Sequence, residues 1–312
     1  MSQHYPHIFE PFTVKRTTFR NRVIMPPMGS NLATFTGEVS EDMKNYYGLR
    51  ARGGTALIIV ENACIDYPLA TNGTKQLRID NKQFIPGLYE LTECIHQYGA
   101  LASIQLNHAG ASAYPERLNG LQAVSASSVP SKEGNPAPRP LEKCEILNIV
   151  QKYAEAAQRA VQAGFDMVEI HGGHSYLLDQ FLSPYYNKRT DEFGGSHENR
   201  ARFSRLVVEA VRKTVGPWVP ISFRISADEF IKGGNTLDDT LKLLEYIEPE
   251  VDIINVSAAV NDSIQYQIDA NYLPDGWRSY MAKAVKEKYG KPCMTVGNIR
   301  DPKVAEDILA KD

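Results

Sequence analysis

The sequence has few cysteines and no cysteine motif. Its four cysteines, Cys64, Cys94, Cys144 and Cys293, lie far apart in 312 residues and form no CxxC or Cys/His pattern. This spacing supports neither a disulfide framework nor an iron–sulfur cluster within the chain, so we expect reduced thiols. The longest apolar runs, such as ALIIV, are far too short to cross a membrane, and the N-terminus lacks the apolar core of a signal peptide. We therefore expect a cytoplasmic protein without membrane contact.

The sequence also lacks an excess of either charge. Lys and Arg together number 34 and Asp and Glu 37, so the formal net charge is -3. No block of like charge offers a surface for nucleic acid or for an anionic membrane. What is present, 43% hydrophobic and 9% aromatic residues, suffices for a sizeable core. We expect a soluble globular protein that acts on a small molecule, and a homo-oligomer is compatible with this composition.

Short apolar runs alternate with longer amphipathic ones, which is typical of parallel strands joined by helices. No GxGxxG fingerprint follows any of these runs, so a doubly wound dinucleotide-binding sheet is disfavoured. Helical spacing connects them, with Gly164 ending one helix and Thr236 capping another. The predicted strands are 22–28, 56–61, 101–107, 167–171, 221–226, 252–257 and 293–297.

These units predict a TIM (β/α)8 barrel with seven strand–helix units present and the eighth missing. An open barrel would leave unpaired strand edges. We therefore interpret residues 1–312 as a single barrel domain, the N-terminal part of a longer protein.

Two segments interrupt the barrel pattern. Residues 110–140, rich in Pro, Ser and Gly, follow the third predicted strand, and residues 258–276 follow the sixth. In a barrel both would lie at the C-terminal face, where active sites are built. We interpret the first as a cap over this face, with a domain linker as the alternative. The second covers the substrate, unless its Tyr266 and Tyr272 only pack the rim.

The segment HGGHSYLLDQFLSP, which begins at His171, follows the fourth predicted strand and has three interpretations. A zinc site would need a third ligand, and the helical HExxH motif is absent, so no metal site is predicted. The histidines can instead be packing residues. Alternatively, the N–H groups of His171 and His174 stabilise negative charge on a carbonyl oxygen, with Tyr176 as the proton donor. The residues alone leave the last two interpretations open.

Other polar residues stand where a barrel strand is expected to be apolar. Gln105 and Arg224 lie near the ends of the third and fifth predicted strands. A buried arginine needs a partner, either an anionic ligand or a carboxylate such as Glu169 or Glu61. Gly297 and Asn298 are expected to open the seventh helix, whose N-terminus would suit a phosphate, although a tight turn also explains the glycine.

The stretch EIHGGHSYLLDQFLSPYYNKRTDEFGGSHENRARF, residues 169–203, resembles the signature of the Old Yellow Enzyme family of FMN-dependent oxidoreductases. The segments FRNRVIMPPM, SIQLNHAG, FRIS and VGNI accompany it in the order expected for that family. The resemblance covers essentially the whole chain. It implies an eight-stranded barrel with FMN at its C-terminal face and NADH or NADPH as the reductant.

Residue roles follow from the resemblance. Gln105 would bond the pyrimidine edge of FMN, and Arg224 would face N1 and the C2 carbonyl. His171 and His174 would hold a substrate carbonyl oxygen. Reduced FMN would pass a hydride from N5 to the β-carbon, while Tyr176 would protonate the α-carbon. The residues expected to contact FMN are Pro26, Pro27, Met28, Gly29, Gln105, Arg224, Gly297 and Asn298.

The reaction implied is reduction of an activated C=C bond in an α,β-unsaturated carbonyl or enoyl compound, an ene-reductase activity. The alternatives are an FMN-dependent amine demethylase or dehydrogenase on the same fold, a non-catalytic truncated fragment, or a sugar-phosphate isomerase or aldolase.

The chain departs from the family pattern at three places. Gly29 replaces a threonine or cysteine, Ser175 replaces a glycine, and the eighth strand with its Gly-Arg phosphate clamp is absent. The MPPMG segment is closer to the enoate and 2,4-dienoyl-CoA reductase branch. In that branch a 4Fe-4S cluster and an FAD domain would follow beyond Asp312.

Overall fold

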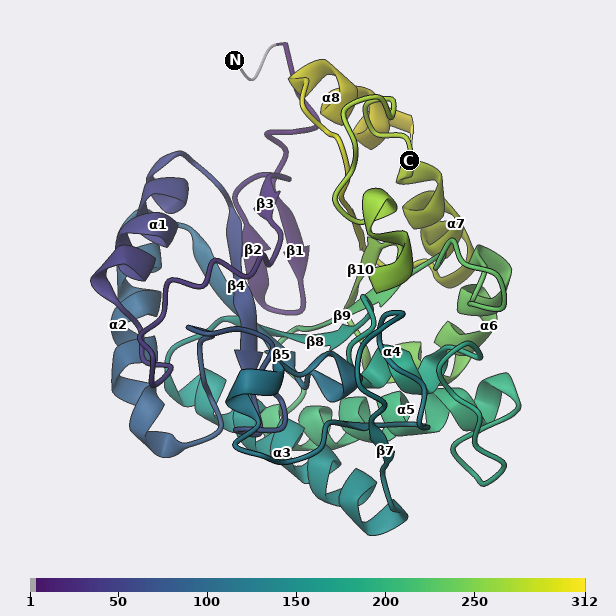
Figure 1. The fold of residues 1–312 in the computed structure, drawn as a ribbon. Helices are drawn as coiled ribbons and strands as arrows, with labels where there is room; N and C mark the ends of the chain where they lie inside the picture. The colour runs from purple at the N-terminus through teal and green to yellow at the C-terminus, as the bar shows by residue number, and fades with distance from the viewer. Residues whose placement is uncertain (1–3, 312) are drawn as a thin grey trace.

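The computed structural model describes residues 4–311, and its centre is a curved sheet of seven parallel strands (Figure 1). Neighbouring strands of this sheet follow one another in chain order, apart from two short strands that lie outside the sheet between the third and fourth strands. The predicted TIM-barrel arrangement of seven strand–helix units is confirmed. In spatial order the strands are β11 (Cys293–Thr295), β10 (Ile253–Ser257), β9 (Ile221–Ser226), β8 (Met167–Gly172), β5 (Leu101–Asn107), β4 (Leu57–Cys64) and β3 (Ile24–Met25).

Helices surround the outside of the curved sheet (Figure 1). Thr236 caps one of them as predicted, because its hydroxyl accepts the N–H of Asp239. The α-helices are α1 (Glu41–Arg52), α2 (Ile85–His96), α3 (Lys143–Gln162), α4 (Leu177–Leu182), α5 (His197–Val215), α6 (Leu237–Ile247), α7 (Ser279–Tyr289) and α8 (Pro302–Lys311). Short 3-10 turns lie at Lys82–Phe84, Gly110–Ser112, Pro115–Arg117, Glu248–Glu250 and Asn261–Tyr266, and β6 (Val124–Ser125) pairs with β7 (Arg139–Pro140).

The first strand is shorter than predicted. The sequence predicts residues 22–28, whereas only Ile24 and Met25 pair with β4. Pro26 and Pro27 follow at once, and a proline has no N–H to donate to a neighbouring strand. The chain therefore leaves the sheet at the two prolines and turns towards its C-terminal face.

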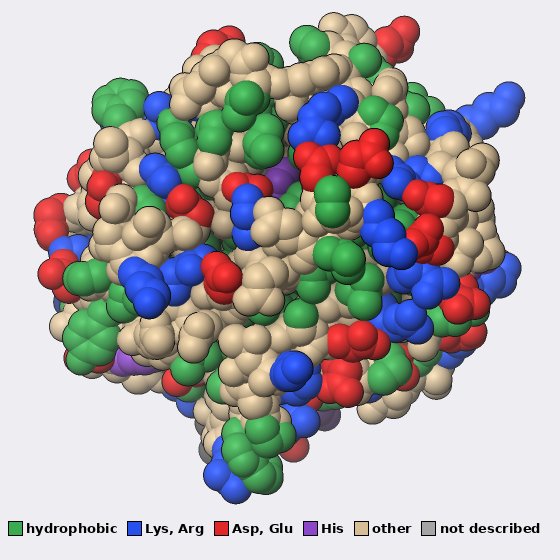
Figure 2. Space-filling model, turned by 90° about the horizontal axis from the view of Figure 1, so that it is seen from below, with side chains coloured by type: hydrophobic (Ala, Val, Ile, Leu, Met, Phe, Trp, Pro, Cys, Tyr) green, Lys and Arg blue, Asp and Glu red, His purple; other side chains and the backbone are tan. Residues whose placement is uncertain are grey.

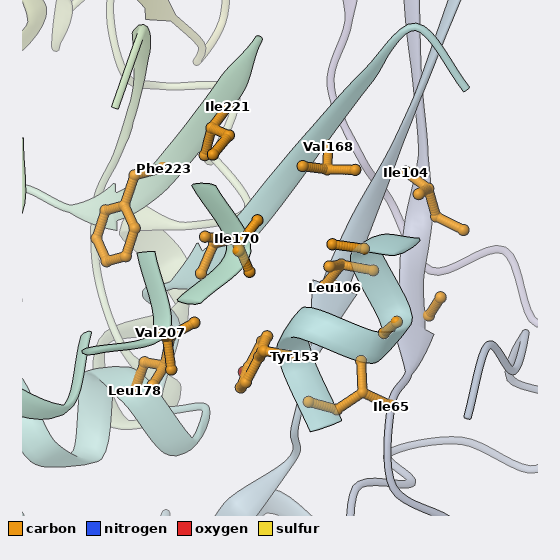
Figure 3. Packing of buried hydrophobic residues seen from close by; sticks show 14 of the residues in the cluster. Ile65, Ile104, Leu106, Tyr153, Val168, Ile170, Leu178, Val207, Ile221 and Phe223 are labelled. Carbon is orange, nitrogen blue, oxygen red and sulfur yellow. The ribbon is translucent and has the colours of Figure 1, made fainter. Parts of the chain in front are cut away.

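Side chains along the strands alternate between the helices and the inside of the curve. On the helix side, apolar residues of β5, β8 and β9 pack against residues of α3, α4 and α5 (Figure 3). Because the side-chain period of a strand is two, the residues between them point inward. The residues drawn on the helix side include Ile104, Leu106, Tyr153, Val168, Ile170, Leu178, Val207, Ile221 and Phe223.

The inside of the sheet is apolar only at its N-terminal end. There the hairpin of β1 (Phe12–Val14) and β2 (Thr17–Phe19) packs Val14 and Phe19 against Ile59, Met167 and other strand residues. Burial of these groups stabilises this end of the barrel by the hydrophobic effect. The polar inward residues therefore stand above a closed apolar floor and face the C-terminal side.

The surface shows no dominant charge. On the face seen in Figure 2, acidic and basic side chains are intermixed with apolar ones. The first described residues reach α8, where the Glu306 carboxylate accepts the backbone N–H groups of His7 and Ile8 at 2.9 and 3.0 Å. Within residues 4–311, no helix combines the length and apolarity needed to cross a membrane.

Candidate functional site

A layer of polar side chains lines the inside of the sheet near its C-terminal end. Gln105, Glu169 and Ser222 share one level of the strand register, and His171, Arg224 and Asn255 share the next. The Glu169 carboxylate accepts hydrogen bonds from the Gln105 amide, the Ser222 hydroxyl and the Asn255 amide, each at 2.9 Å. Burial raises the pKa of Glu169, and the charge of Arg224 and these three hydrogen bonds oppose that rise.

Arg224 is nearly fully buried but has few partners. Its Nη1 donates to the carbonyl oxygen of Pro27 at 3.0 Å, and its Nε has no hydrogen-bond partner in the described structure. Within residues 4–311, no carboxylate forms an ion pair with Arg224: Glu169 is bonded as above, and Glu61 accepts from Tyr47. The alternative of a contact ion pair is therefore not realised in the described structure, although the charge of Glu169 still favours the charged form of Arg224. The cation is left for an anionic or carbonyl-bearing ligand.

The HGGH loop leaves β8 along a path that only small residues allow. A Cβ on Gly172 would overlap the Phe223 ring, and one on Gly173 would lie 2.8 Å from the backbone nitrogen of Ser226. His174 and Ser175 then adopt left-handed backbone conformations, with φ of 60° and 59°. Such conformations are strained for non-glycine residues and persist where other contacts hold them.

Several hydrogen bonds hold this strained turn. The N–H of His174 donates to Ser226 Oγ at 3.0 Å, and that of Ser175 donates to Asp179 Oδ2 at 2.7 Å. The turn brings the rings of His171 and His174 to 5.0 Å between centroids, nearly perpendicular to each other. The Tyr176 ring lies 4.9 Å from that of His171. The three predicted catalytic residues are thus brought together.

Both histidines are buried, and their surroundings decide which ring nitrogen is free. His171 Nδ1 accepts the N–H of Gly173 at 3.3 Å, so its proton is carried by Nε2. His174 Nε2 is paired with the hydroxyl of Ser257 at 2.8 Å, which leaves Nδ1 as its free nitrogen. Burial, followed by the charge of Arg224, holds both pKa values well below the usual 6.5. Both rings are therefore neutral at neutral pH.

The Tyr176 hydroxyl has a partner that the sequence analysis did not identify. Asn72 Nδ2 donates to the Tyr176 oxygen at 2.6 Å, and Asn62 Nδ2 donates to Asn72 Oδ1 at 3.1 Å. Because Asn62 occupies the Asn72 oxygen, the Asn72 NH2 group must face the phenol. Burial raises the pKa of Tyr176, and the Asn72 hydrogen bond opposes that rise. Asn72 lies in the β4–α2 connection, where no motif marks it.

Four of the predicted cofactor residues lie together after β3. Pro26, Pro27, Met28 and Gly29 turn over the C-terminal side of the sheet, where Arg224 contacts Pro27. Met28 is 54% exposed, an unusual state for a large apolar residue beside a polar layer. This segment forms one wall beside Arg224, and its contact with a flavin stays a prediction.

Gly297 and Asn298, the last two of the eight predicted cofactor residues, occupy a different position from the one expected. Helix α8 begins at Pro302, so Gly297 and Asn298 lie in the preceding loop rather than at its N-terminus. That N-terminus is served by Asp301, whose carboxylate accepts the N–H two residues further on. The Asn298 amide donates to two carbonyl groups of residues 258–276. The expected position of these two residues at a helix N-terminus is therefore wrong, whereas their contact with FMN stays a prediction.

Two further carboxyl groups are buried near the HGGH loop, and the charge of Glu229 acts on Asp179. Asp179 accepts the N–H of Ser175, and Glu229 accepts from Ser183 and Asn235. Burial is the main cause that raises the pKa of both groups, that of Glu229 to about 7. In the part of the chain that the structure describes, no group of three or more His, Cys, Asp or Glu residues is arranged to hold a metal ion.

Comparisons with known proteins show the family of this chain. The model of the NADH:flavin oxidoreductase / NADH oxidase family matches residues 7–312. An NADH oxidase of Thermoanaerobacter brockii is 42% identical over 309 residues, which are 99% of this chain and 48% of that protein. An NADPH dehydrogenase of Clostridium acetobutylicum is 35% identical over 306 residues, 98% of this chain and 88% of that protein. The chain thus spans about half of the first relative and most of the second.

Solved structures share the fold. A 2-naphthoyl-CoA reductase matches with a TM-score of 0.90 at 26% identity, over 98% of this chain and 49% of that one. Histamine dehydrogenase from Rhizobium sp. 4-9 matches with 0.87 at 27%, over 98% and 44%. Morphinone reductase matches with 0.81 at 30%, over 98% and 83%. The chain therefore belongs to the NADH:flavin oxidoreductase / NADH oxidase family, the Old Yellow Enzyme family that its motifs predict.

Proposed function

We propose that this chain is the FMN-binding barrel of an oxidoreductase that reduces the activated C=C bond of an α,β-unsaturated carbonyl or enoyl compound. The observation that carries the proposal is the convergence of His171, His174 and Tyr176 at the C-terminal end of β8, beside Arg224, whose Nε has no hydrogen-bond partner in the described structure. Two neutral histidine donors suit a carbonyl oxygen, and the Tyr176 hydroxyl suits a carbon that needs a proton.

The polar layer fits one edge of a flavin ring. The flavin pyrimidine ring presents carbonyl oxygens and N1 as acceptors and N3–H as a donor. Arg224 Nε is a buried donor without a partner in the described structure. The Gln105 amide nitrogen is bonded to Glu169, so its oxygen is the end left to accept a hydrogen bond. Arg224, Gln105 and the segment after β3 would thus hold FMN, which when bound supplies the hydride taken from NADH or NADPH.

The two histidines would bind the substrate through its carbonyl oxygen. His171 donates from Nε2 because its Nδ1 accepts the Gly173 N–H. His174 donates from Nδ1 when the Ser257 hydroxyl donates into its Nε2. Both donors are held in place before substrate binds, so little reorganisation is needed as negative charge develops on the oxygen. Their neutral state keeps that oxygen from being protonated outright.

Tyr176 would deliver the proton to the α-carbon. Because its oxygen already accepts from Asn72, its own hydrogen is free to point towards the substrate. Once the proton has left, the Asn72 donor stabilises the phenolate, and hydrogen bonds to charged groups contribute about 1.5–3 kcal/mol. Asn72 and Asn62 therefore act as positioning residues for this proton transfer.

Substrate reactivity of the FMN-loaded protein tests the proposal. The protein is reduced photochemically under anaerobic conditions and mixed with an enone, an enoate or an amine while flavin absorbance is followed. We expect an enone or enoate to reoxidise the flavin, and Tyr176→Phe to slow this step about 100-fold or more. Tyr98→Phe, which removes the hydroxyl of a tyrosine 40% exposed after α2, is the matched control.

The outcome that contradicts the proposal is reduction of the oxidised flavin by amines together with no reaction of the reduced flavin with any enone or enoate. That result would assign amine dehydrogenation, as the histamine dehydrogenase name of one structural relative suggests for that protein. Failure to bind any flavin would instead favour a non-catalytic scaffold. As the route of electrons from NAD(P)H we further propose a 4Fe-4S cluster and FAD that are held outside residues 1–312.

A further inference from the structure

A cavity of about 400 Å³ opens beside Tyr176. Most of its lining comes from the β5–α3 connection, and Asn72 and Asn261 complete it. The charged residues Glu116, Arg117, Lys132 and Glu133 of that connection are not part of the lining. Tyr176 belongs both to this cavity and to the catalytic cluster. The rest of a substrate whose carbonyl group is bound by the histidines could therefore extend into this cavity.

The lining of the cavity is uncharged. None of the described residues that line it is Lys, Arg, His, Asp or Glu. Apolar walls such as Leu118 and Ala123 alternate with neutral hydrogen-bonding groups such as Gln122 and Asn135. The inner walls Ala111, Ala113, Leu118 and Ser131 are buried, so a charged group placed against them loses part of its hydration without gaining an opposite charge. Amide, ester or hydroxyl groups, in contrast, find neutral donors and acceptors there.

One wall of the cavity is a junction of three barrel loops. The Ser112 hydroxyl donates to the Ser175 carbonyl oxygen at 2.7 Å, and the Asn261 N–H donates to Ser175 Oγ at 2.9 Å. Asn261 Nδ2 closes the triangle by donating to Ser112 Oγ at 3.2 Å. Tyr186 adds a fourth contact to the Ser175 hydroxyl at 2.9 Å. A glycine at position 175 would have no hydroxyl, so the contacts of Asn261 and Tyr186 with this junction depend on the serine side chain.

We propose that this cavity is a subsite for an uncharged part of the substrate, bearing apolar and amide, ester or hydroxyl groups, and that it discriminates against a charged tail. The proposal rests on the proposed function, because it takes the substrate carbonyl to lie at His171 and His174. It adds the class of substrate: a conjugated carbonyl compound extended by a neutral group.

Two enones that differ only at the end of one tail test the subsite. One tail ends in a primary amide and the other in a carboxylate, and their saturated ketone analogues are used for binding. Dissociation constants of the ketones are measured by calorimetry with the FMN-loaded protein, and kcat/KM is measured for the enones. We expect the amide to be preferred about tenfold or more in both measurements.

Charge placed in the cavity should shift this preference in a predictable direction. Ala137 lines the cavity from an exposed loop position, so its substitution leaves the core intact. Ala137→Lys should lower the preference for the amide about tenfold, and Ala137→Asp should raise it by a similar factor. Ala310→Lys, at an exposed position near the end of α8, adds the same charge elsewhere and should leave the preference unchanged.

The results separate the subsite from the reaction. Equal dissociation constants for the two ketones, or a preference that the Ala137 variants do not move, would overturn the subsite. If the ketone preference follows the Ala137 charge while neither enone reoxidises the flavin, the subsite stands and the proposed reaction fails.

Discussion

Glu229 is expected to make the protein less stable as the pH rises, because it is a carboxyl group buried without an ion pair in the described structure. Its side chain is fully buried, and it accepts hydrogen bonds from Ser183 Oγ at 2.7 Å and Asn235 Nδ2 at 3.1 Å. Burial is the largest cause that raises its pKa from 4.5 to about 7, and these hydrogen bonds only partly oppose it. Glu229 therefore ionises at a higher pH in the folded protein than in the unfolded chain.

The size of the effect follows from this pKa shift. Between pH 4.5 and about 7 the unfolded chain has lost the Glu229 proton while the folded protein retains it. The folded state binds more protons in this range, so the free energy of unfolding falls as the pH rises. Since one pKa unit corresponds to about 1.4 kcal/mol, the expected loss across the range is about 3 kcal/mol.

Glu229→Gln tests this expectation, because glutamine has the shape of the protonated acid and cannot ionise. The free energy of unfolding is measured by urea denaturation of wild type and variant at pH 5 and pH 8. The variant should match wild type at pH 5 and exceed it at pH 8 by about 3 kcal/mol. Glu93→Gln removes an exposed carboxylate on α2 as the control. An equal difference between wild type and the Glu229 variant at both pH values would refute the reasoning.

Three further substitutions have specific expected effects. Asn72→Leu should lower kcat of C=C reduction about 10- to 100-fold with little change in KM, because the Tyr176 phenolate loses its donor; an unchanged kcat in stopped-flow assays would contradict this. Arg224→Met should lower flavin occupancy, measured as the ratio of flavin to protein absorbance, whereas retained stoichiometric flavin would show that the guanidinium is dispensable. Thr236→Ala should lower the free energy of unfolding by about 1 kcal/mol in chemical denaturation through loss of the α6 cap.

The strands of this chain can be predicted from the sequence because each strand has apolar residues that face the helices. The segments ISFRIS and LASIQLN coincide with β9 and β5, and Thr236 caps α6 where the sequence places a cap. Residue spacing and helix caps depend on neighbours in the chain, so they can be predicted without knowledge of the fold. The first strand failed as a prediction because its two prolines end the ladder after Met25.

In the candidate site, too, some residues could be predicted from the sequence and others could not. The motif beginning at His171 is contiguous, so the cluster of His171, His174 and Tyr176 was predictable, and the strand register explains why Arg224 lies beside it. Asn72 was missed because its bond to Tyr176 joins positions 104 residues apart, and no pattern along the chain records such a contact. The placement of Gly297 and Asn298 before α8 rather than at its start depends on where Pro302 begins the helix.

The sequence by itself determined the order of strands and helices, the family and the identity of the residues that face the inside of the sheet. Only the tertiary structure decided which of their atoms are free. It shows that His174 has Nδ1 available because Ser257 holds Nε2, that Arg224 Nε has no hydrogen-bond partner among residues 4–311, and that Ser175 joins three loops. Periodicity assigns a side chain to a face, whereas hydrogen bonds between strands and loops distant in the chain exist only once the sheet has curved and brought them together.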